Sequence, residues 1–145
     1  MPLLAVRHIQ DLHRRFPTND ACLAYLFDLR FSDVTCPECK RRNSYHRHPV
    51  QARYTCTCGD SQIYPCKGTL FENSPLPLTK WFYALFFLWR KQGDVKAVEL
   101  QRKLRVTYTT AWWMMKRMQS AIEETKLGDE YGRFESFLAA VAQCG

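Results

Sequence analysis

Two short cysteine pairs constrain this chain more than any other feature. They are Cys36-x-x-Cys39 and Cys56-x-Cys58, with sixteen residues between them. Pairs at this separation are typical of a structural zinc site, in which two tight turns present thiolates at the corners of a tetrahedron. The second pair has one intervening residue, Thr57, where two are usual. The pattern predicts a Zn²⁺ site on all four cysteines, held in a small β ribbon.

The fourth corner of this site has alternatives. Cys66, His46 or His48 can also supply a zinc ligand from nearby in the sequence. Reduced cysteines that act as small apolar side chains would account for Cys22 and Cys144, but they explain the paired spacing poorly. A disulfide scaffold is disfavoured by the odd total of seven cysteines and by the lack of a recognisable secretory signal.

The charge of the chain points to a polyanionic partner. The net charge is +7 and the pI is about 9.2. Residues 79–122 hold nine Lys or Arg and two acidic residues, so 9 − 2 = +7 matches the excess of the whole chain. Double-stranded DNA is therefore the expected partner, ahead of a membrane surface. The longest apolar run, residues 81–89, is far below the roughly 18 residues of a membrane span, and we expect a cytoplasmic, nucleoid-associated protein.

Proline positions help to divide the chain into four segments. Phe16-Pro17 breaks the first helical run, and Thr18 is a candidate cap of the helix that follows. Pro75 and Pro77 end the ribbon region, because neither a helix nor a central strand continues through them. We expect an α+β fold, mostly α: a zinc-ribbon hairpin flanked by an N-terminal helix and a C-terminal three-helix helix-turn-helix. The predicted segments are a helical segment over residues 1–31, a zinc ribbon over 32–74, a helix-turn-helix over 75–124 and a tail over 125–145. The tail is either a short terminal helix, with Phe134, Phe137, Leu138 and Val141 at helical spacing, or out-of-frame sequence.

The helix-turn-helix prediction depends on three candidate caps. Thr79, Asp94 and Thr107 each precede an amphipathic run, and the turn before Thr107 is short. The third helix would be the recognition helix, with Ala111, Met115, Met118 and Ile122 facing inward. We expect Trp112 and Trp113 to pack in or beside the core rather than to stack on bases. The predicted DNA-contacting residues are Lys103, Arg105, Thr107, Tyr108, Thr109, Trp113, Lys116 and Arg117.

Several short motifs resemble one protein family in their order along the chain. They span residues 16–122 and are FDLRF at 27–31, CPEC at 36–39, Y-x-C at 54–56, GTLFENS at 68–74, LPL-x-x-WFYA at 76–84 and TAW-x-M at 110–114. This succession is similar to the N-terminal part of bacterial insertion-sequence transposases that place a zinc ribbon and a helix-turn-helix ahead of a DDE catalytic domain.

The resemblance implies recognition of transposon ends, with Cys36, Cys39 and Cys56 as zinc ligands. The family's fourth cysteine aligns with Gly59, so Cys58 is displaced by one position. The resemblance also implies a chain truncated before its catalytic carboxylates, since DDE chemistry needs three of them on two metal ions. Asp129 resembles the start of that domain, but we expect it to lie in a surface loop, and we expect this chain not to catalyse DNA cleavage.

The sequence is compatible with two other functions. One is a stand-alone DNA-binding regulator that occupies transposon ends, and the other is a zinc-ribbon adaptor for protein partners. A second copy of the chain or a full-length transposase is a further expected partner.

Overall fold

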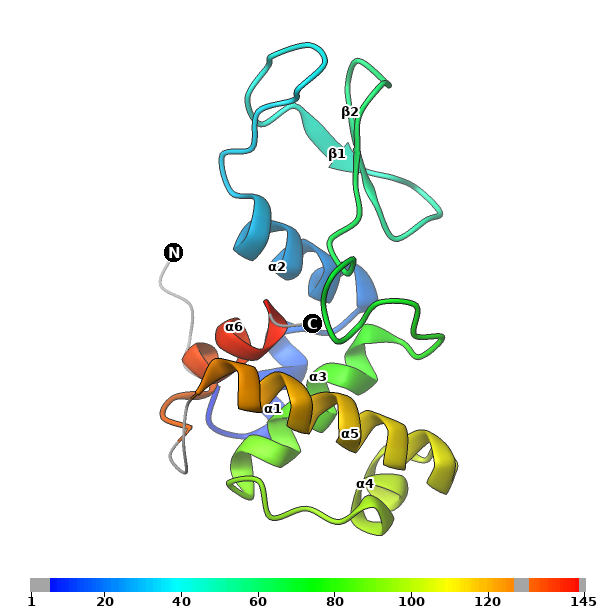
Figure 1. The fold of residues 1–145 in the computed structure, drawn as a ribbon, viewed down its shortest axis with the longest axis vertical. Helices are drawn as coiled ribbons and strands as arrows, with labels where there is room; N and C mark the ends of the chain where they lie inside the picture. The colour runs from blue at the N-terminus through cyan, green and yellow to red at the C-terminus, as the bar shows by residue number, and fades with distance from the viewer. Residues whose placement is uncertain (1–5, 127–130, 144–145) are drawn as a thin grey trace.

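A computed structural model describes residues 6–126 and 131–143. In these residues it has six helices and three short strands. The elements, in chain order, are α1 (Ile9–Arg15), α2 (Asn19–Phe31), β1 (Tyr45–Arg47), β2 (Tyr54–Cys56), β3 (Gln62–Ile63), α3 (Leu78–Arg90), α4 (Ala97–Leu104), α5 (Tyr108–Thr125) and α6 (Phe134–Ala142). The strands form an antiparallel sheet in the order β1-β2-β3. The sheet and its loops lie at one end of the long axis and the helices fill the rest (Figure 1), so the predicted α+β, mostly helical class is confirmed.

The first two helices are separated where the sequence predicts a break. Phe16 ends α1 and Pro17 follows it, and the Thr18 hydroxyl then caps α2 by accepting a hydrogen bond from the Ala21 backbone at 3.1 Å. Phe16 is buried and meets the Phe82 ring of α3 edge-to-face, with centroids 4.9 Å apart. This aromatic contact joins the first helices to the helical core.

The sheet has almost no apolar core of its own. Tyr45 pairs with Cys56 across the first hairpin, and Tyr54 pairs with Ile63 across the second. In residues 32–64, all of which the structure describes, Cys36 and Cys56 are the only buried side chains. Burial alone cannot order so small a module, so its loops need another constraint.

α3 is the central helix of the core. It contacts α1, α2, α4 and α6, and Trp81, Phe82 and Leu85 are at most 2% exposed. The predicted Thr79 cap is wrong, because the helix begins earlier, after Pro77. Pro77 is the N-cap residue and makes no side-chain cap hydrogen bond. The Thr79 backbone N–H donates to the Asn19 side chain at 3.2 Å.

The starts of the next two helices differ in how well the sequence predicts them. Asp94 does not cap α4, which begins after Lys96, where the Glu99 carboxylate accepts the Lys96 backbone N–H at 3.3 Å. Thr107 does cap α5, accepting the Thr110 backbone N–H at 3.2 Å. Three of the four side chains predicted to face inward from α5 are buried and Ile122 is partly buried.

The segment predicted as a tail contains a buried helix. α6 packs against α3 and α5, and Phe134 and Phe137 are at most 1% exposed. The Trp89 indole donates to the Gly132 carbonyl at 2.9 Å, and the Val6 backbone N–H donates to the Glu135 carboxylate at 2.5 Å. The core therefore continues across the predicted boundary at residue 125. The predicted surface loop at Asp129 lies outside the described residues.

Across residues 6–126 and 131–143, every helix is too short or too polar to cross a bilayer.

Candidate metal centre and nucleic-acid interface

Four cysteine sulfurs converge at the end of the ribbon. The Sγ atoms of Cys36, Cys39, Cys56 and Cys58 all lie within 4.8 Å of one another. The Cys36–Cys58 pair is 3.8 Å apart and the Cys39–Cys56 pair is 3.5 Å apart. A tetrahedral Zn²⁺ ion with Zn–S bonds of about 2.3 Å holds its sulfurs about 3.8 Å apart. The cluster therefore has the donor atoms and spacing that a tetrahedral metal ion needs.

Backbone hydrogen bonds shape the two loops that carry these sulfurs. In the first loop the Cys36 N–H donates to the Arg41 carbonyl and the Lys40 N–H donates to the Cys36 carbonyl, each at 2.9 Å. In the second loop the Gly59 N–H donates to the Cys56 carbonyl at 2.9 Å, with Gly59 at φ +82°. This left-handed conformation suits glycine and turns the chain directly after Cys58. The tight turn allows Cys58 to reach the cluster with only one residue between it and Cys56.

The surroundings of the cluster shift the pKa values of its thiols in different directions. The Ser44 hydroxyl, 3.0 Å from the Cys56 sulfur, and the Cys58 backbone N–H lower the pKa of Cys56 to about 6. The Cys39 backbone N–H lowers the pKa of Cys36. The Asp60 backbone N–H favours a Cys58 thiolate, but desolvation and the neighbouring sulfurs outweigh it and raise the pKa of Cys58 to about 12. A bound dication would stabilise all four thiolates together.

The alternative ligands lie outside this group of four in the described part of the chain. Cys66 packs against the hydrophobic core, and burial raises the pKa of its thiol to about 11. His48 uses its Nδ1 to accept the backbone N–H groups of Val50 and Gln51 at 3.1 and 2.9 Å. His46 is exposed on β1. The structure therefore favours Cys58 at the fourth corner.

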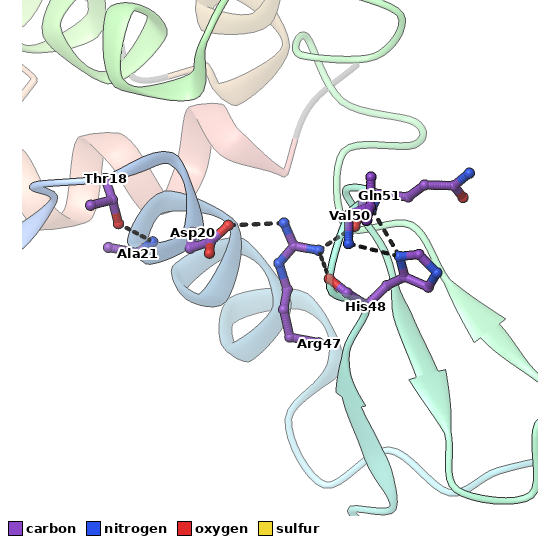
Figure 2. Close-up of polar contacts among 7 residues, drawn as sticks. All are labelled: Thr18, Asp20, Ala21, Arg47, His48, Val50 and Gln51. Carbon is purple, nitrogen blue, oxygen red and sulfur yellow. Dashed lines mark hydrogen bonds and ion pairs between the residues drawn. The ribbon is translucent and has the colours of Figure 1, made fainter.

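An ion pair and a ring stack fasten the ribbon to α2. Figure 2 shows the Arg47 guanidinium between the Asp20 carboxylate, at 2.9 Å, and the carbonyl oxygens of His48 and Gln51. The Phe27 ring of α2 stacks on Tyr54 with centroids 4.0 Å apart and planes 12° apart. These contacts connect the cysteine loops to the helices through α2.

Two arginines donate hydrogen bonds to backbone carbonyls of the segment between the ribbon and α3. Arg30 donates to the carbonyls of Pro65 and Lys67 at 2.5 and 2.8 Å. Arg117 donates to the carbonyls of Leu70 and Glu72 at 3.1 and 3.0 Å. Arg117 is also a predicted phosphate contact, and the structure uses its Nη1 to join α5 to this segment.

The other predicted DNA-contacting residues lie on and around the start of α5. α4 and α5 are joined by the three residues 105–107, with Arg105 in the left-handed conformation at φ 55°. Tyr108 and Trp113 are 51% and 57% exposed. Lys103, Arg105, Thr109 and Lys116 are also exposed.

Two tryptophans and one threonine are placed differently from what their predicted roles suggest. Trp112 is 40% exposed and, like Trp113, projects from α5 rather than entering the core. The Thr107 hydroxyl donates to Thr110 Oγ1 at 2.9 Å while it caps α5, so its single O–H donor is used inside the protein. The spacing of Trp112, four residues from both Tyr108 and Lys116, indicates in the sequence that it shares their exposed side of the helix.

The two predicted sites do not meet. The loops that follow α2 and β2 lie at one end of the long axis in Figure 1, and α4 lies at the other end. A metal at the cysteine cluster therefore contacts the ribbon and not the α4–α5 pair.

The chain is similar to a protein from a transposable element. It is 29% identical over 92 residues to the uncharacterized protein in transposable element ISH50 of Halobacterium salinarum. The match covers 62% of this chain and 31% of that protein, so the chain spans about a third of its relative's length. No family model matches the sequence, and no solved structure is significantly similar to it.

Proposed function

We propose that this chain is the DNA-binding part of an insertion-sequence transposase. In this proposal it recognises transposon-end DNA through a zinc ribbon and the α4–α5 pair, and strand cleavage and joining are left to other residues or another chain. The relative's name supports a transposable-element role. The metal is assigned as Zn²⁺ because four thiolates at tetrahedral spacing suit Zn²⁺ better than the oxygen-seeking Mg²⁺ or Ca²⁺.

The exposed face of α4 and α5 is the observation that carries the proposal. A three-residue turn joins the helices, and no acidic residue occurs between Tyr108 and Ile122. The positive end of the α5 dipole follows exposed Arg105 in the chain. Lys103 is also exposed, with its ammonium 5.7 Å from the centroid of the Phe87 ring. Hydroxyl and aromatic side chains at the start of a helix can reach base edges, while cations farther along reach phosphates.

Zinc has a structural role in this proposal. The ribbon buries almost nothing except two of the cysteines, so the metal would order its loops and, through Arg47 and Phe27, present them on α2. The ribbon then holds a fixed position relative to the helical core, and the two modules can engage one duplex at separate points.

The salt dependence of duplex binding tests the proposal. We expect anisotropy titrations of a labelled random-sequence duplex to lose affinity steeply between about 50 and 200 mM salt, with a log–log slope of about −0.9 for each phosphate contacted. Lys116→Ala should reduce this slope by about one unit. Arg14, exposed on α1, is the matched control, and Arg14→Ala should leave the slope unchanged.

A salt-insensitive or absent interaction with DNA would contradict the proposal and favour the protein-adaptor alternative. Plasmid nicking that requires Mg²⁺ or Mn²⁺ and co-purifies with the chain through two chromatographic steps would contradict the non-catalytic part alone. Arg117→Ala is unsuitable for this test, because it removes two hydrogen bonds to backbone carbonyls within the protein.

A further inference from the structure

We infer that Trp112 is a sequence-reading residue, and that Tyr108, Trp112 and Lys116 form the stripe of α5 that enters the DNA groove. This inference rests on the proposed function and assigns the base-reading role to one side of the helix.

The three residues share one face of α5. They are spaced four positions apart, so their side chains follow one another along the helix. Tyr108 and Trp112 are 51% and 40% exposed, and the Lys116 ammonium lies 5.3 Å from the centroid of the Trp112 ring. A cation at this distance interacts favourably with the indole face. The stripe therefore has two aromatic side chains near the start of the helix and a charge one turn beyond them.

The neighbouring side of α5 lies beside the segment that precedes α3, although Trp113 on this side is 57% exposed. Trp113 and Arg117 border a 280 Å³ pocket that Pro75, Leu76 and Trp81 also line. Arg117 lies five positions from Trp112, or about 140° around the helix, and is hydrogen-bonded to the segment before α3. That segment flanks Trp113 at this pocket, which Trp112 does not line, and we therefore assign groove entry to the Trp112 side.

The chemistry of the stripe suits base readout. An indole offers an apolar edge for a thymine methyl group and one N–H donor for a purine N7 or a carbonyl oxygen in the major groove. Trp113 packs edge-to-face against Trp112 with centroids 5.3 Å apart, which restricts the rotation of the Trp112 ring. Lys116 lies farther from the start of the helix, where the phosphate backbone passes. Trp112 would therefore carry sequence information and Lys116 would carry affinity.

A pair of adjacent tryptophan variants tests the inference. A binding site is first selected from a random duplex pool with the wild-type chain, and affinities for this duplex and for a scrambled duplex are measured at fixed salt. We expect Trp112→Ala to reduce the preference for the selected duplex about tenfold, the scale of one lost base contact, with its salt slope unchanged. Trp113→Phe, which keeps a ring beside Trp112, is the matched control and should keep the preference within about twofold.

A second variant and a fluorescence measurement distinguish a loss of base recognition from a loss of folding. Trp112→Phe keeps an aromatic ring without the N–H donor and should keep the fold while losing part of the preference. In Trp113→Phe, Trp112 is the most exposed of the three remaining tryptophans, and its fluorescence should change on addition of the selected duplex.

Three outcomes would overturn the inference. Trp112→Ala and Trp112→Phe could both keep the wild-type preference, Trp113→Phe could lose as much preference as Trp112→Ala, or the fluorescence of Trp113→Phe could stay constant at saturation. In each case salt-dependent binding by the wild-type chain would leave the proposed function standing. Failure of the wild-type chain to bind any duplex would overturn both.

Discussion

Substitution of Cys58 is the most informative perturbation of the metal centre. Its sulfur lies 3.8 Å from that of Cys36, and serine keeps its size while replacing the thiolate with a hydroxyl that stays protonated. Structural zinc sites in small domains contribute about 10–16 kcal/mol at neutral pH. If the four sulfurs contribute equally to this free energy, Cys58→Ser removes about 2.5–4 kcal/mol, which weakens zinc binding roughly 10²- to 10³-fold.

The assay combines metal content with local protection from exchange. Zinc per chain is measured by elemental analysis, affinity by competition with a chromophoric chelator, and backbone protection by hydrogen exchange. In Cys58→Ser we expect substoichiometric zinc and loss of protection over residues 33–63, because Cys36 and Cys56 are the only buried side chains there. The helices should keep their protection, since their core is formed by other side chains.

Cys66→Ser is the matched control. Cys66 is half-buried against the core and lies outside the sulfur cluster. This variant should bind a full equivalent of zinc and lose on the order of 1 kcal/mol of stability. Full zinc in Cys58→Ser together with zinc loss in Cys66→Ser would refute the assignment of the fourth ligand.

Three further predictions concern the helical core, each measured as the free energy of unfolding in denaturant. Gly93→Ala should cost about 1–3 kcal/mol, because Gly93 has φ +86° and an added Cβ would lie 2.4 Å from Tyr131 Oη; Gly132→Ala, at φ +67° in open space, should cost less. Phe137→Ala should cost about 3–5 kcal/mol, because its ring is 0% exposed on α6; a cost below about 1 kcal/mol would exclude α6 from the core. Burial raises the pKa of Cys22 from 9.0 to about 12, so as pH rises its thiol ionises in the unfolded chain before it ionises in the folded one. The free energy of unfolding should therefore fall above pH 9 by up to about 1.4 kcal/mol per pH unit. Cys22→Ala should remove that part of the pH dependence.

Features that depend on a few neighbouring residues were readable from the sequence. The break at Phe16 and Pro17, the caps at Thr18 and Thr107, and the inward side of α5 all agree with the structure. Each depends on hydrogen bonds or steric exclusion within one or two turns of chain. The two cysteine pairs also belong here, because the spacing inside each pair already specifies a turn that presents sulfur.

Features that depend on distant contacts were decided by the tertiary structure. Thr79 resembles a cap locally, yet α3 starts after Pro77 and Thr79 bonds to Asn19, sixty positions away. Asp94 likewise precedes an amphipathic run but does not begin α4. A side chain that suits a local role can be used in a distant contact instead, and sequence spacing does not reveal that choice.

The same reason explains what the sequence alone determined about the candidate sites and what it left open. It determined which residue types are present to hold a metal and to face a polyanion. Only the folded chain brought Cys58, rather than Cys66, to the other three sulfurs, turned Arg117 toward the carbonyls of Leu70 and Glu72, and buried α6 beside α5. These outcomes follow from packing between segments far apart in the chain, and that packing sets the direction in which each side chain points.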